Sequence, residues 1–380
     1  MIPLAVPNLT GNERKYLNEC IDTTFVSSVG EFVNRLEADA AAATGAASAV
    51  ATSAGTTALH AALMVLGVRP GDYVIVPSFT FIASANSIRH AGAYPWLFDI
   101  DPTSWCIDLD QVERELKRAC FTLNGTTYHR ATGNRVSALM PVYTLGNLPN
   151  MDQARRICDE WHLALIADAA CAIGATFQGR ALAELADLSA ISLNGNKTIT
   201  AGGGGLVVGT NEELLAEVHH LTTTARVWPD YDFDRVGYNY RLTNLQAAVA
   251  VAQLERLDEF VARKRAVRKV YDEAFAGIGG VSTFPVPSWC ESSCWFSGIV
   301  VEDAAKTQSV VAKLNERGIG AKAFWKPVHL QAPYASCERA NELSVSEGLW
   351  DKVITLPCST GITDEEVVEV IAVTKEVLSA

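Results

Sequence analysis

Two side chains that could act together in catalysis follow two successive apolar segments of the sequence. Asp168 ends the segment 163–168, and Lys197 closes the tetrapeptide Asn-Gly-Asn-Lys that comes after the segment 188–193. If both segments are strands of an open α/β sheet, their carboxyl ends lie at one edge, where such sheets bind ligands. Each residue alone has a simpler interpretation, because Asp168 could cap a helix or form a core salt bridge and Lys197 could be a surface lysine. As a pair at one edge, they indicate a site.

An acid and an amine so placed suit the chemistry of pyridoxal 5′-phosphate (PLP). An amine can hold this cofactor as a Schiff base, and a buried carboxylate beside the pyridine nitrogen keeps that nitrogen protonated, so that the ring acts as an electron sink. The amine must also be able to lose its proton, which desolvation or a neighbouring cation favours. Four glycines at 202–205 would allow the backbone to approach a flat ligand. The sequence therefore predicts Lys197 as the Schiff-base lysine and Asp168 as its acidic partner.

The phosphate of such a cofactor needs a cradle of hydrogen-bond donors. The segment 53–57 (Ser-Ala-Gly-Thr-Thr) precedes a helical apolar stripe, and a helix N-terminus offers free amides and a favourable dipole. Ser192 could add a hydroxyl from a strand end, and Phe81 could stack on the ring face. The segment 53–57 is also consistent with a helix that is merely well capped. Phe81 is also consistent with a phenylalanine of the hydrophobic core.

The elements that would position these residues alternate between strands and helices. Continuous apolar strands between amphipathic helices are typical of a mostly parallel sheet covered on both faces. We therefore predict an α/β fold, with a central sheet sandwiched by helices, in a large domain at residues 25–245. The segments expected as strands are 73–76, 138–143, 163–168, 188–193 and 206–208, and a helix is expected at 151–161.

A smaller α+β domain is expected at residues 246–380, with the N-terminal segment 1–24 packing alongside it. The helical pattern capped by Thr243 runs to Tyr271, which is too long for an ordinary helix, so we expect it to kink or break. A strand at 295–301, a helix at 306–317 and a last helix from Thr363 to residue 378 are expected to follow, and residues 10–13 fit a helix capping box.

Size, charge and cysteine usage limit the class of protein. A chain of 380 residues exceeds the usual single hydrophobic core, which favours two domains. The formal net charge of −12 argues against a nucleic-acid or anionic-membrane partner, so a phosphate ligand would need backbone amides and a few local cations. We see no secretory signal, no bilayer-length apolar run and no metal-binding cysteine spacing. Nine cysteines without a signal suit a reducing cytosol, so we expect a cytoplasmic protein without a metal.

The order and spacing of several short motifs resemble the DegT-type sugar aminotransferases, which are fold-type-I PLP enzymes. The resemblance runs nearly end to end and is carried by residues 55–60, 76–81, 168–170, 192–197, 237–248 and 326–334. It implies a cofactor-binding set that consists of Gly55, Thr56, Phe81, Asp168, Cys171, Ser192 and Lys197.

The same resemblance implies contacts beyond this set. Asn239 matches a residue that reaches the phosphate from the neighbouring subunit, which implies a homodimer with shared active sites. His329 and Tyr334 fall in a segment that lies near the sugar nucleotide in the family. Two positions depart from the family pattern, because Ala167 replaces a glutamate and Cys171 replaces a Gln, Glu or His. A thiol makes only a weak polar contact near the cofactor's 3-hydroxyl; Cys171 could be reactive or simply a small buried residue.

The activity that the resemblance implies is amino transfer from L-glutamate, through the pyridoxamine form (PMP), to the C4 keto group of a nucleotide-linked 4-keto-6-deoxy sugar. The loop 194–197 and the four glycines favour a UDP-N-acetylhexosamine substrate, and a GDP-perosamine synthase-type reaction is the alternative. A PLP-dependent sugar dehydratase is disfavoured, because those relatives replace the lysine with histidine and this sequence retains Lys197. A PLP-holding regulator is disfavoured by the lack of a basic patch or helix-turn-helix.

Overall fold

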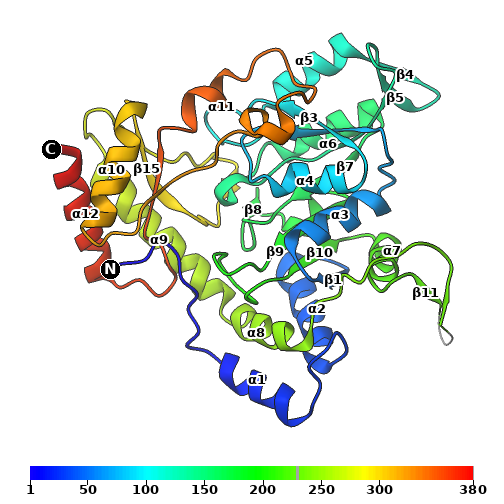
Figure 1. The fold of residues 1–380 in the computed structure, drawn as a ribbon, viewed down its shortest axis with the longest axis horizontal. Coiled ribbons are helices and arrows are strands. Elements are labelled where there is room, and N and C mark those ends of the chain that lie inside the picture. The colour runs from blue at the N-terminus through cyan, green and yellow to red at the C-terminus, as the bar shows by residue number, and fades with distance from the viewer. Residues whose placement is uncertain (228–230, 380) are drawn as a thin grey trace.

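The centre of the molecule is a nine-stranded sheet, as seen in a computed structural model that describes residues 1–227 and 231–379 (Figure 1). Its strands, in spatial order, are β1 (Ser48–Thr52), β10 (Gly205–Gly209), β9 (Leu188–Ser192), β7 (Ala164–Asp168), β6 (Arg135–Leu139), β2 (Tyr73–Pro77) and β3 (Tyr94–Phe98), with β4 (Cys120–Leu123) and β5 (Thr126–His129) attached to β6. The five strands from β9 to β3 run parallel, whereas β1, β10 and the β4–β5 hairpin pair antiparallel. The predicted parallel sheet is thus confirmed at the centre.

Helices cover both faces of this sheet and give each face its own apolar core. Strands β2, β9 and β10 are buried along their whole length, which is why they read as continuous apolar runs. One face carries α3 (Gly55–Val65), α4 (Ala83–His90) and α7 (Glu212–Thr222), and the other carries α2 (Glu31–Thr44), α5 (Leu109–Ala119), α6 (Met151–Trp161) and α8 (Asn244–Leu254).

A smaller domain with an antiparallel sheet packs at one side of the molecule, where both chain termini lie (Figure 1). It has its own apolar core. Its strands, in spatial order, are β13 (Val281–Thr283), β15 (Ser297–Val301), β17 (Val353–Leu356) and β16 (Lys322–Ala323), and its helices are α9 (Leu257–Phe275), α10 (Ala304–Glu316) and α12 (Asp364–Ser379). The remaining elements are α1 (Glu13–Asp22), α11 (Ser344–Leu349), β8 (Thr176–Phe177), β11 (Arg226–Val227), β12 (Asp232–Phe233), β14 (Cys290–Glu291) and the 3₁₀ turns η1 (Thr144–Gly146), η2 (Leu182–Glu184), η3 (Val328–Leu330) and η4 (Ala332–Tyr334).

The long helical pattern breaks as predicted, but the break does not separate the domains. Thr243 caps α8 by accepting from the amide of Gln246, α8 ends at Leu254, and α9 begins at Leu257. Helix α8 packs on α1 and α2 and belongs to the core of the large domain, whereas α9 passes from that core at Phe260 to the core of the smaller domain. We therefore place the boundary within α9, further along the chain than residue 245.

The N-terminal segment also divides between the two domains. Ile2 pairs with Ile319 of the smaller domain, whereas α1 packs on α8 of the large domain. The predicted capping box at its start is wrong, because Asn12 is the N-cap and makes no side-chain cap bond. The hydroxyl of Thr10 instead donates to Oδ1 of Asn8.

No helix within residues 1–227 and 231–379 combines the length and the apolar composition needed to cross a bilayer. The nine cysteines all lie in these ranges, and each is a free thiol.

Candidate active site

A cavity of about 680 Å³ opens at the carboxyl ends of β7 and β9 and is lined by both domains. Parallel pairing of β7 with β9 brings the two strand ends together, with Asp168 opposite Ala190. The structure thus gathers the predicted cofactor set in one place. The predicted residues that line the cavity are Gly55, Thr56, Phe81, Asp168, Cys171, Ser192 and Lys197.

Asp168 ends β7 as a buried carboxyl group that is 4% exposed. Its Oδ2 accepts a hydrogen bond from the Ser84 hydroxyl at 2.6 Å, and its Oδ1 accepts from the Ala170 amide at 3.1 Å. Burial raises the pKa of this carboxyl, and the two donors and the charge of Lys197 oppose that rise. The group is therefore buried, oriented and held by donors that favour its charged form.

Lys197 extends into the cavity from the turn that follows β9. Its amide donates to the carbonyl of Asn194 at 3.0 Å, and its Nζ lies 3.1 Å from Sγ of Cys171 and 3.9 Å from the centre of the Trp295 ring. Burial raises the pKa of the Cys171 thiol, although Lys197 opposes the rise. Cys171 is therefore a buried neutral neighbour of the amine, and this environment does not favour a reactive thiolate.

The N-terminus of α3 supplies the donors that a phosphate needs. Its first-turn amides have no acceptor within the helix, and Ala54, at the N-cap position, has no side-chain acceptor. A Cβ at Gly205 would lie 2.8 Å from backbone atoms of Ala54 and Gly55, and a Cβ at Gly55 would lie 2.9 Å from Cβ of Ser192. Only glycine permits this close approach. Free amides at one end, with a carboxyl and an amine at the other, fit PLP.

The smaller domain adds an aromatic wall and a cation that the sequence did not predict. Phe324 and Trp325 stack with ring centres 4.2 Å apart, and Trp325 lies 6.2 Å from Phe81. Trp295 and Lys322 also line the cavity. The aromatic pair directly precedes the motif 326–334, which was the available signal in the sequence.

Three predicted residues lie outside the cavity lining. Asn239 is exposed and pairs with Thr223. His329 is 3% exposed; its Nδ1 lies 2.6 Å from the Ser78 hydroxyl, and its Nε2 lies 3.0 Å from Glu347. Burial lowers the pKa of His329, although Glu347 opposes the change.

Tyr334 is also buried, and its hydroxyl donates to Oδ1 of Asn86 on α4. His329 and Tyr334 therefore hold the segment 326–334 against β2 and α4. Both side chains are engaged with protein partners, and their direct contact with a substrate stays a prediction.

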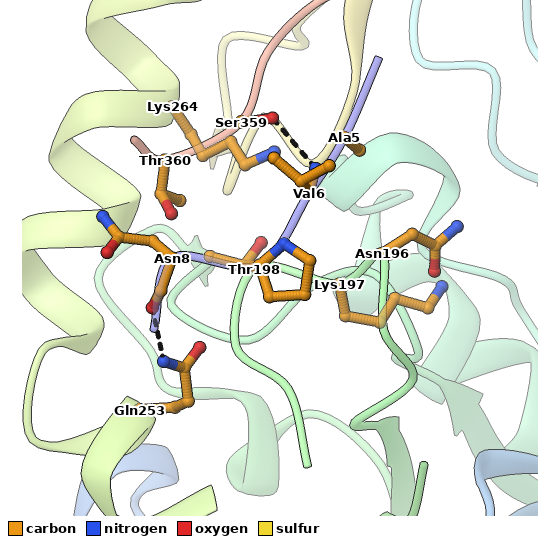
Figure 2. A pocket seen from close by; sticks show the side chains of 11 residues that line it. Ala5, Val6, Asn8, Asn196, Lys197, Thr198, Gln253, Lys264, Ser359 and Thr360 are labelled. Atoms are coloured by element: carbon orange, nitrogen blue, oxygen red, sulfur yellow. Dashed lines mark hydrogen bonds between the residues drawn. The ribbon is translucent and has the colours of Figure 1, made fainter. Parts of the chain in front are cut away.

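A second hollow of about 10 Å³ lies behind the lysine loop, where the N-terminal segment crosses it (Figure 2). The amide of Val6 donates to the hydroxyl of Ser359 at 2.9 Å, and the side chain of Gln253 donates to the carbonyl of Asn8 at 2.7 Å. Figure 2 shows the amine of Lys197 directed away from Lys264. This hollow holds at most one water-sized occupant, so it belongs to the packing behind the site.

Comparisons with known proteins agree with this geometry. Residues 7–375 match the sequence model of the DegT/DnrJ/EryC1/StrS aminotransferase family. A GDP-perosamine synthase from Caulobacter vibrioides is 37% identical over 99% of this chain and 98% of its own length, and one from Vibrio cholerae is 34% identical over 97% of each. The crystal structure of the aminotransferase TlmJ from Streptoalloteichus hindustanus superposes with a TM-score of 0.89 at 26% identity and covers 100% of this chain and 99% of its own. The predicted resemblance and fold class are confirmed, and the chain belongs to the DegT/DnrJ/EryC1/StrS family of PLP-dependent sugar aminotransferases.

Proposed function

We propose that this enzyme transfers an amino group from L-glutamate to the C4 keto group of a GDP-linked 4-keto-6-deoxy sugar, with Lys197 as the attachment point of PLP. The observation that carries the choice of nucleotide is that relatives aligned along nearly the whole chain, at 37% and 34% identity, are GDP-perosamine synthases. This choice replaces the UDP-N-acetylhexosamine substrate favoured by the loop 194–197 and its glycines. Those features lie in the cofactor half of the site, so they carry little information about the nucleotide.

Different residues of the chain would hold different parts of the cofactor. When bound, PLP supplies an electron sink for the carbon that exchanges its amino group. The first-turn amides of α3 and the hydroxyl of Ser192 hold the phosphate, and Phe81 covers one ring face. Asp168 holds the proton on the ring nitrogen. Lys197 would hold the cofactor and would move a proton at the reacting carbon.

The electrostatics of the cavity support a nucleotide-linked substrate. The chain as a whole repels an anion at a net charge of −12, but Lys322 and Lys197 place positive charge in the cavity. The stacked pair Phe324 and Trp325 offers a flat apolar face for a base or a sugar ring. A volume of about 680 Å³ is within the usual range for sites that bind small molecules.

We also propose that two copies of the chain share their active sites through Asn239. Its side chain is exposed and does not line the cavity of its own chain. The adjacent Tyr240 accepts a hydrogen bond from the amide of Ser53 at 2.7 Å, so the segment runs beside the start of α3. Mixing Lys197→Ala with Asn239→Ala subunits should restore about a quarter of the wild-type activity, because random pairing in a two-fold dimer leaves one intact site in each mixed dimer. No recovery beyond either parent would remove the shared site.

The test of the substrate is a panel of GDP-, UDP- and dTDP-linked 4-keto-6-deoxy sugars with ¹⁵N-labelled glutamate, with the products read by mass. We expect the label to enter the GDP-linked sugar most rapidly. Label that enters only the UDP-linked sugars would restore the other nucleotide class, and label in none of them would refute the proposal. Borohydride reduction followed by peptide mapping should place PLP on Lys197; a tag elsewhere would reassign the attachment lysine.

A further inference from the structure

Trp295 contacts the lysine loop in two different ways. The Nζ atom of Lys197 lies 3.9 Å from the centre of the Trp295 ring, and the indole N–H donates to the carbonyl of Asn196 at 2.7 Å. One contact acts on the amine of the lysine, and the other acts on the peptide that precedes it. Trp295 lies two residues before β15, so these contacts join the smaller domain to a loop of the large domain.

The main chain of Trp295 is itself fixed on both sides. Its amide donates to the carbonyl of Leu145 at 2.9 Å, and its carbonyl accepts from Nζ of Lys264 at 2.9 Å. Lys264 is 2% exposed and lies on α9, and Figure 2 shows its side chain extending from this helix towards the N-terminal segment. These two hydrogen bonds therefore hold the main chain of Trp295 independently of its contacts with the lysine loop.

The environment of the amine gives the ring a distinct role. Within residues 1–227 and 231–379, Lys197 forms no ion pair; its Nζ contacts the ring of Trp295 and the thiol of Cys171, and the charge of Asp168 acts on it from further away. A neutral thiol is a weak acceptor, whereas the face of an indole attracts a cation and is the strongest such partner among the aromatic side chains. The ring thus attracts and orients the ammonium of Lys197 without neutralising its charge.

We propose that Trp295 is a positioning residue that holds and orients the ammonium of Lys197 in the cofactor-free protein. This inference rests on Lys197 as the attachment lysine, as proposed above. A carboxylate in the same place would bind the amine more strongly and would compete with its return to the cofactor. The ring gives orientation with a weaker hold. The opposing interpretation is that Trp295 only fills the core of the smaller domain, in which it is buried.

The two interpretations differ in the protonation of the lysine in cofactor-free protein. Lys197 can be labelled with acetic anhydride over a series of pH values, and the label quantified by peptide mass. Only the neutral amine reacts, so the pH at half-maximal labelling reports protonation, whereas a change in access alters the rate at every pH alike. Trp295→Leu keeps the site apolar but removes the ring, and Trp295→Phe keeps a ring of weaker attraction and removes the N–H.

We expect the half-maximal pH to fall in Trp295→Leu, with labelling below that pH about 2- to 30-fold faster, the range expected for loss of a cation–π contact. Trp295→Phe should shift in the same direction by less. The matched control is Trp289→Leu, because the indole of Trp289 also donates to a carbonyl, that of Leu148 at 3.0 Å, but does not line the cavity. This control should label as the wild type does.

An unchanged half-maximal pH in folded Trp295→Leu would overturn the inference. If Trp295→Leu does not fold, an unchanged half-maximal pH in Trp295→Phe would overturn the inference instead. A shift of equal size in Trp289→Leu would also overturn it. Borohydride mapping of the loaded wild type separates this failure from that of the proposed function. PLP found on another lysine would refute both the attachment of PLP to Lys197 and the role of Trp295. PLP on Lys197 with no shift in the half-maximal pH of labelling would refute only the role of Trp295.

Discussion

The hydroxyl of Ser84 donates a 2.6 Å hydrogen bond to Oδ2 of Asp168, and both side chains are buried. The hydroxyl of Thr80 lies 2.8 Å from that of Ser84 and extends the chain of polar groups. Burial alone raises the pKa of Asp168, which would favour a neutral acid. Ser84 acts against burial, so a residue of α4 helps to decide whether the acid is charged.

Replacing Ser84 with alanine should slow turnover without preventing PLP binding. Oδ2 of Asp168 would lose its donor, which favours the neutral acid and weakens its hold on the ring proton. The loss of a hydrogen bond to a charged group, about 1.5–3 kcal/mol, sets an upper limit of roughly 10- to 150-fold on kcat. Because the charged form is disfavoured, the acid limb of the kcat profile should move to higher pH.

Ser87→Ala is the control for this change. Ser87 is a buried serine of the same helix, and its hydroxyl donates to the carbonyl of Ser84 at 2.7 Å. It does not line the cavity. We expect kcat and its pH profile to stay close to those of the wild type. An equal loss in both variants would mean that Ser84 matters for the stability of α4 and not for Asp168.

Asp168→Asn should separate binding of the cofactor from its use. An asparagine fits the same space and leaves the donors of the α3 N-terminus in place, so the purified protein should still bind PLP. It carries no charge to hold the ring proton, and we expect kcat to fall on the order of 100-fold or more, as for other lost electrostatic contacts to developing charge. Absorbance of bound PLP and steady-state rates measure the two effects. A variant with wild-type kcat would refute the role of Asp168.

The placement of Asp168 and Lys197 at one edge of the sheet could be predicted from the sequence because its signals are local. Apolar runs that end in Asp168 and shortly before Lys197 are strands β7 and β9, and parallel pairing is enough to bring their ends together. Helix α6 likewise has the predicted bounds, because its stripe and its Asn150 cap lie in neighbouring residues. The roles of these residues remain predictions.

What the sequence did not predict depends on contacts between distant segments. Trp295 comes from the smaller domain, and nothing near it in the sequence distinguishes an aromatic residue that faces the cavity from one in a core. The core to which α8 belongs is decided by its packing on α1 and α2, which residues near 245 do not reveal in the sequence. The β4–β5 hairpin was missed although its Asn124 and Gly125 form a favoured hairpin turn.

Gly205→Ala should damage the phosphate end of the site. A Cβ at this position would lie 2.8 Å from the carbonyl carbon and oxygen of Ala54 and from the amide nitrogen of Gly55. These are backbone atoms, so the start of α3 must shift, and its amides would no longer point towards the position of the phosphate. We expect a loss of about 1–3 kcal/mol in the free energy of unfolding of the cofactor-free protein, together with weaker PLP binding.

Gly279→Ala provides the comparison for Gly205→Ala. Gly279 is exposed, and a Cβ there meets no heavy atom within 4 Å. Its thermal unfolding and its PLP titration should match those of the wild type. If Gly205→Ala also matched the wild type in both measurements, the close approach of β10 to α3 would have no bearing on the cofactor.

Stability should depend on pH through His60, a buried residue of α3. Burial, with a smaller contribution from His90, lowers the pKa of His60 to about 4, and its Nδ1 lies 3.2 Å from the hydroxyl of Tyr240. An unfolded histidine titrates near pH 6.5, so between pH 6.5 and 4 the unfolded chain binds the extra proton. The contribution of neutral His60 is therefore complete above about pH 6.5 and is lost as the pH falls towards 4.

His60→Asn removes this titration and should weaken the dependence of the free energy of unfolding on pH. Urea unfolding at pH 7.5 and pH 5 should give a smaller loss of stability in the variant than in the wild type, by about 1–2 kcal/mol. Any constant cost of the substitution appears at both pH values and cancels in the comparison. His162→Asn tests an exposed histidine in the left-handed region, which asparagine tolerates, and its pH dependence should follow the wild type. Equal slopes for wild type and His60→Asn would show that the buried imidazole does not govern the acid sensitivity of the fold.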